Sequence, residues 1–193
     1  MADTPGDSTH EDWSRDPGWR LGWRLLLLVI PGVLQREAKR NSGDPLALLR
    51  DVALSFMLAI VFMGIPLSFL PPDQQGSAWV SVGTVLGVAL IAFVAPRVIE
   101  RPLDCSSDLS LIGSYRARFF IRVAFAESIA LVSFVLHFVS GPSWIYFLGG
   151  GIALIRMASR APTPAALIRD QDELTARGCG RSLVAAFRHP QPG

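Results

Sequence analysis

Long runs of apolar residues, separated by short polar segments, dominate the middle of the chain. Three of these runs, at 52–70, 78–95 and 119–139, approach or exceed the length of a bilayer crossing. A hydrocarbon core about 30 Å thick is crossed by about 20 helical residues, so each run predicts a membrane-spanning helix. A fourth run, 142–158, is marginal, because the three glycines at 149–151 interrupt its middle.

The basic residues lie on alternate connections between the runs. The connections 71–77 and 140–141 contain no Lys or Arg, whereas both ends of the chain and the connection 96–118 contain them. Cytoplasmic loops collect Lys and Arg, so both termini and the connection 96–118 are predicted to face the cytoplasm. Ends on the same side require an even number of crossings. We therefore predict an all-α fold, with a four-helix transmembrane bundle over 51–160.

The segment before the first run divides into two parts. Residues 1–18 are rich in Asp and Glu and predict a disordered acidic leader. Residues 19–50 predict a cytoplasmic or interfacial helical segment, in which Trp19, Trp23 and Leu26 share one helical face. Such a helix is suited to the headgroup layer, and packing against the bundle is the alternative interpretation.

The tail, 161–193, predicts a cytoplasmic helical hairpin. Thr163 is suited to be the N-cap and Pro164 the first residue of a helix that Gly178 ends. The apolar side of this helix is predicted to contain Leu167, Ile168 and Leu174. A second short helix is predicted over 181–187. A hairpin of this size is too small to bury a core alone, so docking on the bundle and docking on a protein partner both stay open.

Composition agrees with a membrane protein and excludes other classes. Of the 193 residues, 50% are hydrophobic and 18% charged, and the mean hydropathy is +0.38. A net charge of +2 does not indicate a nucleic-acid partner. Arg outnumbers Lys by 17 to 1, a bias typical of bacteria with GC-rich genomes. The expected location is therefore the bacterial inner membrane, with the lipid bilayer as the first partner.

No pattern of reactive residues points to catalysis. Cys105 and Cys179 are isolated in the sequence. Both are assigned to the reducing cytoplasm, where disulfides are rare, and two separate thiols do not make a zinc site. The sequence contains no nucleotide-binding, metalloprotease or nucleophile-elbow motif. We predict no catalytic residue, no metal and no cofactor.

Glu127 is the polar residue that the membrane interpretation has to explain. It lies about 12 Å into the third run at 1.5 Å per residue, near the bilayer centre, where a charged carboxylate costs several kcal/mol. Arg122 lies about 140° away around the helix and is predicted to extend toward the membrane surface. The partner of Glu127 must come from another helix, and the hydroxyl groups available are those of Ser55, Ser68, Ser81 and Thr84.

Small residues predict how the second and third spans pack. Gly83 and Gly87 form a G-x-x-x-G motif, which allows close approach of a neighbouring helix. The third span has a small and polar side that contains Arg122, Ala126, Ala130, Ser133 and His137. We therefore expect the second span to pack on the third through Gly83, Gly87, Ala126 and Ala130, with Glu127, Ser81 and Thr84 as the interhelical polar site. A homo-oligomer also stays open.

The pair of helices from Trp79 to Val139 resembles the hairpin of the rotary ATP synthase c subunit. Both combine a glycine-containing helix, a basic cytoplasmic loop and a helix with one mid-membrane carboxylate. The resemblance implies that Glu127 carries a proton or sodium ion. The family has a denser glycine repeat and a much shorter loop than 96–118. The segment Ala124–Leu131 with the tail also resembles small bacterial multi-pass membrane proteins of no known function.

Two functions follow from these observations. The first is a non-enzymatic subunit or scaffold of a membrane complex, with the cytoplasmic tail available to a protein partner. The second is a proton or cation pathway that uses Glu127. An intramembrane carboxylate favours the second function, whereas the absence of another titratable group beside it favours the first.

Overall fold

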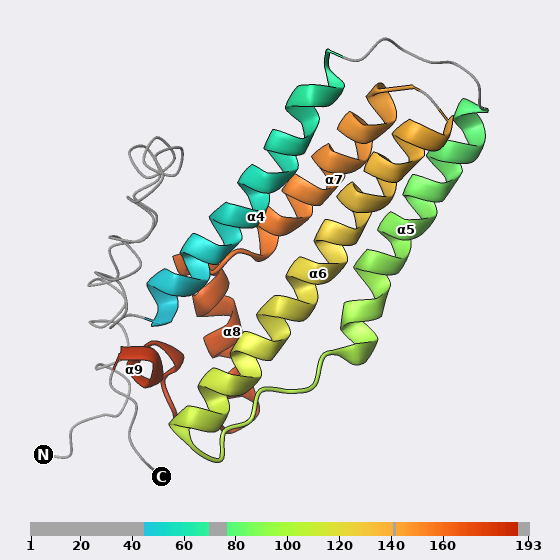
Figure 1. The fold of residues 1–193 in the computed structure, drawn as a ribbon. Coiled ribbons are helices and arrows are strands. Elements are labelled where there is room, and N and C mark those ends of the chain that lie inside the picture. The colour runs from blue at the N-terminus through green and yellow to red at the C-terminus, as the bar shows by residue number, and fades with distance from the viewer. Residues whose placement is uncertain (1–44, 70–76, 141, 189–193) are drawn as a thin grey trace, which may run out of the picture. The chain divides into compact units, whose positions relative to one another are not determined.

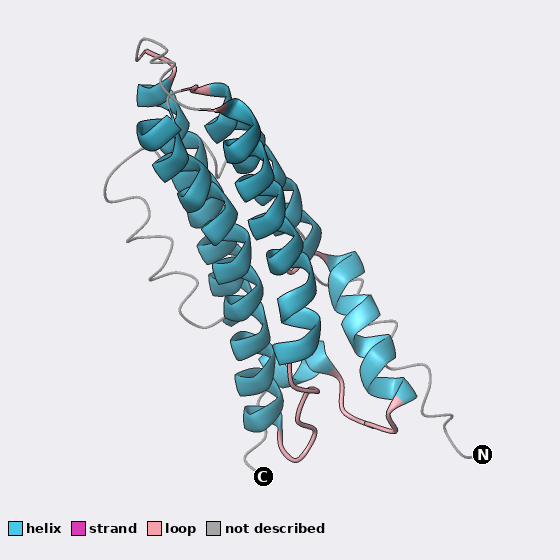
Figure 2. Ribbon diagram, turned by 90° about the vertical axis from the view of Figure 1, so that its right-hand side faces the viewer, coloured by secondary structure: helices cyan, strands magenta, loops and turns pink. Residues whose placement is uncertain are grey.

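In the computed structural model, residues 45–69, 77–140 and 142–188 are described, and all their regular elements are helices (Figures 1 and 2). The helices are α4 (Pro45–Leu67), α5 (Ala78–Ile99), α6 (Asp108–Ser140), α7 (Trp144–Arg160), α8 (Pro164–Ala176) and α9 (Leu183–Arg188). The prediction of an all-α protein is confirmed for these residues. The expected acidic leader and interfacial helix lie outside them, apart from residues 45–50, which form the start of α4.

The described residues belong to two compact units. Unit 1 contains 45–51, 102–116 and 162–188, and unit 2 contains 52–101 and 117–161. Three helices are long and apolar enough to cross a membrane, over Leu46–Leu67, Ala78–Ile99 and Asp108–Val139. α7 is shorter, with 17 residues.

α6 begins eleven residues before the apolar run that predicted it. Ser107 precedes its first residue, and the Ser107 hydroxyl accepts a hydrogen bond from the backbone N–H of Ser110 over 3.1 Å. Asp108 then places a carboxylate in the first turn, where the helix dipole stabilises negative charge. The apolar pattern could not locate this start, because polar and charged residues interrupt the added turns.

In unit 2, α7 is the helix that contacts each of the other three. The Tyr146 hydroxyl donates a hydrogen bond to the carbonyl of Ile60 on α4. Gly149 lies against Ser133 of α6, and an arginine farther along, Arg156, donates through Nη2 to the carbonyl of Ala92 on α5 over 3.2 Å. These contacts are distributed along α7, so its whole length is packed.

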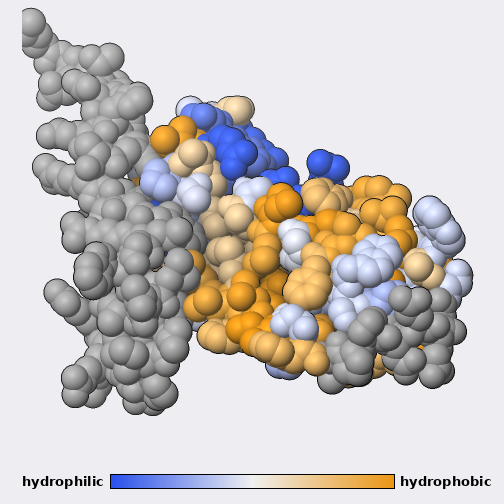
Figure 3. Space-filling view, turned by 90° about the horizontal axis from the view of Figure 1, so that it is seen from above, coloured by the Kyte–Doolittle hydropathy of each residue, from blue (hydrophilic) through white to orange (hydrophobic). Residues whose placement is uncertain are grey.

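The remaining outer faces of the unit 2 helices are apolar. Large hydrophobic side chains point outward from α4, α5 and α6, including Phe62, Leu90 and Phe138, whose exposed fractions are 50%, 64% and 61%. In the view of Figure 3, hydrophobic residues cover much of the described surface, beside a hydrophilic region. Soluble monomers rarely expose contiguous apolar areas of this kind, and lipid chains are the natural solvent for them.

Of the small residues predicted to join the second and third spans, those of α6 are buried and those of α5 are exposed. Ala126 and Ala130 are buried, with exposed fractions of 0% and 1%. Gly83 and Gly87 are exposed, and a Cβ atom added to either would meet no described atom within 4 Å. The buried side of α5 is formed instead by Ser81, Val85, Ala89, Ala92 and Pro96. The G-x-x-x-G motif therefore faces away from the other described helices of the chain.

Unit 1 contains the two helices of the tail, α8 and α9. The Thr163 hydroxyl caps α8 by accepting a hydrogen bond from Ala166 N over 3.2 Å, and Pro164 is the first helical residue. The helix ends at Ala176 with Arg177 as its C-cap residue, and Gly178 adopts φ +78°, a backbone conformation suited to glycine. The apolar-face prediction holds for Leu167 and Leu174, which are buried, and fails for Ile168, which is 44% exposed.

Candidate functional site

One carboxylate, Glu100, is held by two arginines of α6 in unit 2. Arg122 donates to both oxygens of Glu100, through Nε over 2.8 Å and through Nη2 over 2.7 Å. The Nε atom of Arg118 lies 3.0 Å from Glu100 Oε2. All three side chains are largely buried, with exposed fractions of 10% for Glu100, 10% for Arg118 and 13% for Arg122. This is a two-pronged guanidinium–carboxylate pair, the strongest form of such a contact.

The sequence positions each member of this group. Glu100 is the C-cap residue of α5, and its backbone N–H donates to Pro96 O. Arg118 and Arg122 are four residues apart, so they lie on the same side of α6. Burial alone would raise the pKa of the Glu100 carboxyl, but the hydrogen bond and charge of Arg122, with the charges of Arg118 and Arg160, outweigh it and lower that pKa. Glu100 is therefore ionised at neutral pH.

The exclusion of an Arg122–Glu127 pair agrees with the structure, in which Arg122 pairs with Glu100. The sequence predicted that Arg122 extends toward the membrane surface and named no partner for it. The signal was present in the sequence: Glu100 is the single acidic residue directly after the second apolar run. The side of α6 on which Glu100 would pack depends on the path of the connection, which residue spacing does not encode.

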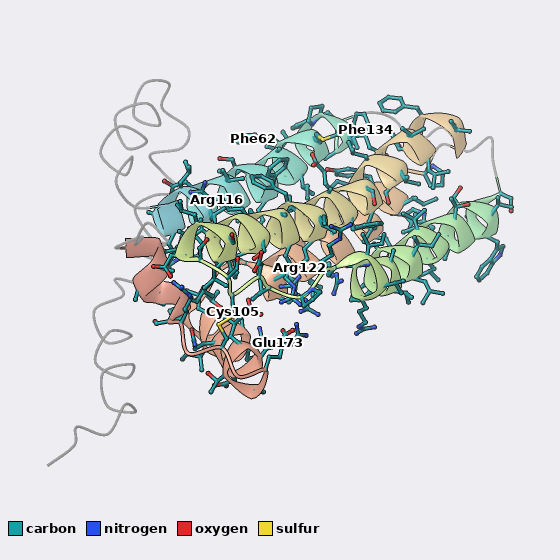
Figure 4. The ribbon with its side chains drawn as sticks, turned by 90° about the horizontal axis from the view of Figure 1, so that it is seen from below. Phe62, Cys105, Arg116, Arg122, Phe134 and Glu173 are labelled. Atoms are coloured by element: carbon teal, nitrogen blue, oxygen red, sulfur yellow. A yellow bond between two sulfur atoms is a disulfide. The ribbon has the colours of Figure 1, made fainter. Side chains whose placement is uncertain are left out.

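Arg156 of α7 is a second buried cation in unit 2. Its exposed fraction is 5%, and its guanidinium carbon lies 4.3 Å from the centroid of the Phe93 ring. The Arg156 Nε atom is buried and has no hydrogen-bond partner among the described residues. Figure 4 labels Arg122, near which guanidinium nitrogen atoms gather. The arginines Arg97, Arg122 and Arg160 lie near enough for their charges to act on Arg156.

The predicted polar site at Glu127 is not assembled by the described residues. Glu127 is partly buried on α6 and forms no hydrogen bond or ion pair with any of them. Ser81 is buried on the inner side of α5. Thr84 is exposed and donates to the carbonyl of Val80 in its own helix over 2.9 Å. Thr84 points outward because it shares the face of Gly83 and Gly87.

The prediction that Cys105 and Cys179 stay unpaired is contradicted by the structure. The two residues form a disulfide in unit 1, with their Cα atoms 6.1 Å apart (Figure 4). Their separation of 74 residues carries no sequence signature of a pair. The hairpin of α8 and α9 brings Cys179 to the connection that precedes α6.

Further contacts hold the hairpin to the same part of unit 1. Arg181 Nη1 donates to Asp108 Oδ1 over 2.6 Å, and Tyr115 packs edge-on against Phe187 with ring centroids 5.4 Å apart. The Gln171 side chain joins the two helices by accepting from Leu183 N over 2.7 Å and donating to Arg181 O over 3.0 Å. The hairpin thus docks on residues of its own chain.

We expect loss of the disulfide to loosen this docking. A crosslink that closes a loop of this length stabilises a fold by about 2–4 kcal/mol. Dithiothreitol should therefore raise amide hydrogen exchange in α9 by at least tenfold in the wild-type protein. In Cys105→Ser, exchange should already be fast and should not respond to the reductant. Equal exchange in all four samples would show that the disulfide contributes nothing to docking.

The described residues contain no group of three or more His, Cys, Asp or Glu side chains suited to hold a metal ion. Comparisons with protein-family models, curated proteins and solved structures found no match to this chain. The functional argument therefore rests on the geometry of the chain itself.

Proposed function

We propose that the chain is a non-enzymatic, four-pass membrane protein that acts as a subunit or scaffold of a membrane complex. The supporting observation is the position of α7. This helix has 17 residues, about 26 Å of helix at 1.5 Å per residue. It contacts α4, α5 and α6 along its length through Tyr146, Gly149 and Arg156. This packing among three apolar helices of spanning length supports a fourth membrane crossing.

The proposed orientation places both termini and the connection 96–118 in the cytoplasm, in a bacterial inner membrane. It rests on the arginine distribution. Cytoplasmic thiols are kept reduced, so Cys105 and Cys179 are expected to be thiols in the cell and to form their disulfide after oxidation. The oxidation state of these two cysteines in the cell therefore tests the orientation.

Topology reporters at Gly76 and Gly141 should read as external in intact cells. Cys105 and Cys179 should react with a membrane-permeant maleimide and should be protected from an impermeant one until the membrane is opened. Cytoplasmic reporter activity at either glycine would refute four crossings in this orientation. Cysteines that react with maleimide only after reduction would place the disulfide on an oxidising side.

The tail offers the surface for a protein partner. The buried face of α8 packs within unit 1. Ile168 and Arg169 of the same helix are exposed. The outward G-x-x-x-G of α5 is likewise unused among the described helices, and a second copy in the membrane could pack on it. Catalysis forms no part of the proposal.

A tail variant tests the scaffold role. Ile168→Glu should release a partner that co-purifies with the wild-type chain in stoichiometric amount in mild detergent. Ala185→Glu, an exposed position on α9, adds the same charge and should retain the partner. Purification of the wild-type chain without any stoichiometric protein would contradict the scaffold role.

A proton or cation pathway through Glu127 is the second candidate function. The observation that favours it is the contrast between carboxylates: Glu100 and Asp108 are paired with arginines, whereas Glu127 has no hydrogen-bond or ion-pair partner among the described residues. An apolar helix that retains an unpaired carboxylate is typical of ion handling.

Glu127→Gln should abolish pH-driven proton flux into proteoliposomes and leave helical content unchanged. The loss is expected to be complete, because an amide does not exchange a proton at neutral pH. Fluorescent dye quenching measures the flux. Equal flux with both proteins, or no flux above empty liposomes with either, would refute the pathway.

A further inference from the structure

Unit 2 collects arginines at one end of its helices. Arg97 lies in the last turn of α5, Arg118 and Arg122 lie on α6, and Arg156 and Arg160 lie near the end of α7. With Glu100, these five arginines form the arginine cluster, which has a net charge of +4. The charges of Arg118, Arg122 and Arg160 act on Glu100, and those of Arg97, Arg122 and Arg160 act on Arg156. The cluster is therefore one electrostatic group.

Two arginines of the cluster have N–H groups that donate to no described residue. Arg156 is 95% buried, since its exposed fraction is 5%. Its Nη2 donates to Ala92 O, but its buried Nε has no partner among the described residues. A buried donor on a charged group is costly when it is left unsatisfied. Arg97 is exposed and hydrogen-bonds to no described side chain or backbone group.

The surroundings of the cluster are apolar. On α5, Phe93, Val94 and Val98 have exposed fractions of 36%, 45% and 80%, close in sequence to Arg97. Phe93 also lies under the Arg156 guanidinium. A ligand bound here would thus meet guanidinium groups and an exposed apolar helix face together.

We propose that the arginine cluster binds the phosphate of an anionic phospholipid headgroup, while the acyl chains lie on the exposed face of α5. Guanidinium groups recognise phosphate through paired hydrogen bonds. Basic sites between membrane helices on the cytoplasmic side are typical binding places for anionic lipids. The exposed apolar residues beside Arg97 favour a lipid over free phosphate. This inference rests on the proposed membrane location.

The test compares soluble short-chain phosphatidylglycerol with phosphatidylcholine of the same acyl length. Both are titrated into the full-length protein in neutral detergent at fixed ionic strength, and the unfolding temperature is followed. Phosphatidylglycerol should raise the temperature in a saturable way, and phosphatidylcholine should not. Inorganic phosphate alone should have no effect, because it lacks the acyl contacts.

Arg97→Gln should weaken the apparent affinity for phosphatidylglycerol about tenfold, the size expected of one charge-assisted contact. Arg169→Gln, an exposed position on α8, removes the same charge and should bind like wild type. Because Arg97 is exposed, its variant should keep wild-type helicity by circular dichroism. An equal response to both lipids, or an equal loss in both variants, would overturn the proposal.

An equal shift with inorganic phosphate alone would overturn the lipid source and leave a free-phosphate site. Cell fractionation distinguishes a failure of the proposed lipid site from a failure of the proposed membrane function. A chain that is absent from the membrane fraction refutes the membrane role, whereas a membrane-bound chain that does not prefer phosphatidylglycerol refutes only the lipid site.

Discussion

Gly149→Ala should be among the most destabilising single substitutions in the chain. A Cβ atom at Gly149 would lie 1.7 Å from Ser133 Oγ, 2.5 Å from Ser133 Cβ and 3.3 Å from Ile129 O. Ser133 has an exposed fraction of 0%, and its hydroxyl is held by a hydrogen bond to Ile129 O over 2.7 Å. It has no room to withdraw, so α6 and α7 must move apart. We expect a loss of about 3 kcal/mol, the upper range for overpacking.

Two variants make this prediction specific. Gly151→Ala adds the same methyl group two residues away, where no described atom lies within 4 Å, and should leave stability unchanged or slightly raised. Ser133→Gly combined with Gly149→Ala removes the hydroxymethyl group that the new methyl would meet and should recover most of the loss. Reversible unfolding in mixed micelles measures all three variants. A Gly149→Ala protein as stable as Gly151→Ala would refute the close approach of α6 and α7.

Glu100→Gln should also destabilise the protein strongly. Glutamine retains the size of the side chain but removes the charge that Arg118 and Arg122 share. Both guanidinium groups are largely buried, and removing one partner of a buried ion pair costs about 3–5 kcal/mol. Glu127→Gln is the matched control, because Glu127 pairs with no described residue. It should change stability by less than about 1 kcal/mol.

The double variant Glu100→Gln, Arg122→Gln tests whether the pair itself carries the effect. The double variant should lose less stability than the two single variants lose in sum. Each single variant leaves one charge of the pair buried without its partner, whereas the double variant removes both charges. Strict additivity of the two single effects would show that Glu100 and Arg122 do not interact.

The same carboxylate predicts a dependence of stability on pH. The folded pKa of Glu100 is below its ordinary value of 4.5, so the folded state favours the ionised form. Its stabilising contribution is therefore full above about pH 4.5 and is lost as the pH falls through the lower, folded pKa. The stability difference between wild type and Glu100→Gln should shrink in that acidic range. A difference that stays constant from pH 7 to pH 3 would contradict the assignment.

Local patterns were sufficient for most of the helices. The apolar runs located α4, α5 and α7 to within a few residues, apart from the additional turns at the start of α4. Thr163, Pro164 and Gly178 located both ends of α8, because capping and glycine turns depend on neighbouring residues only. The stripe of Ala126, Ala130 and Ser133 correctly marked the buried side of α6. In each case the interactions responsible join residues within a few helical turns of one another.

Partner choice between helices was where these patterns failed. Gly83 and Gly87 were suited to a helix contact, but α5 turned Ser81, Val85 and Ala89 inward instead. A small-residue motif permits close approach without stating which helix approaches. The close approach occurs between Ser133 of α6 and Gly149 of α7, and Gly149 lies in the run that the sequence showed as the weakest span. Its glycines, which reduced its apolar character, are what allow α7 to pack.

By itself, the sequence determined that the described residues form helices, three of them apolar and of spanning length, and where the basic residues concentrate. These properties depend on local composition and do not change with the way in which the helices pack. Only the tertiary structure decided that α7 contacts the other three helices, that Glu100 pairs with Arg122, and that Cys105 meets Cys179. Each of these contacts joins residues far apart in the sequence, so no local pattern of residues states which partner is chosen.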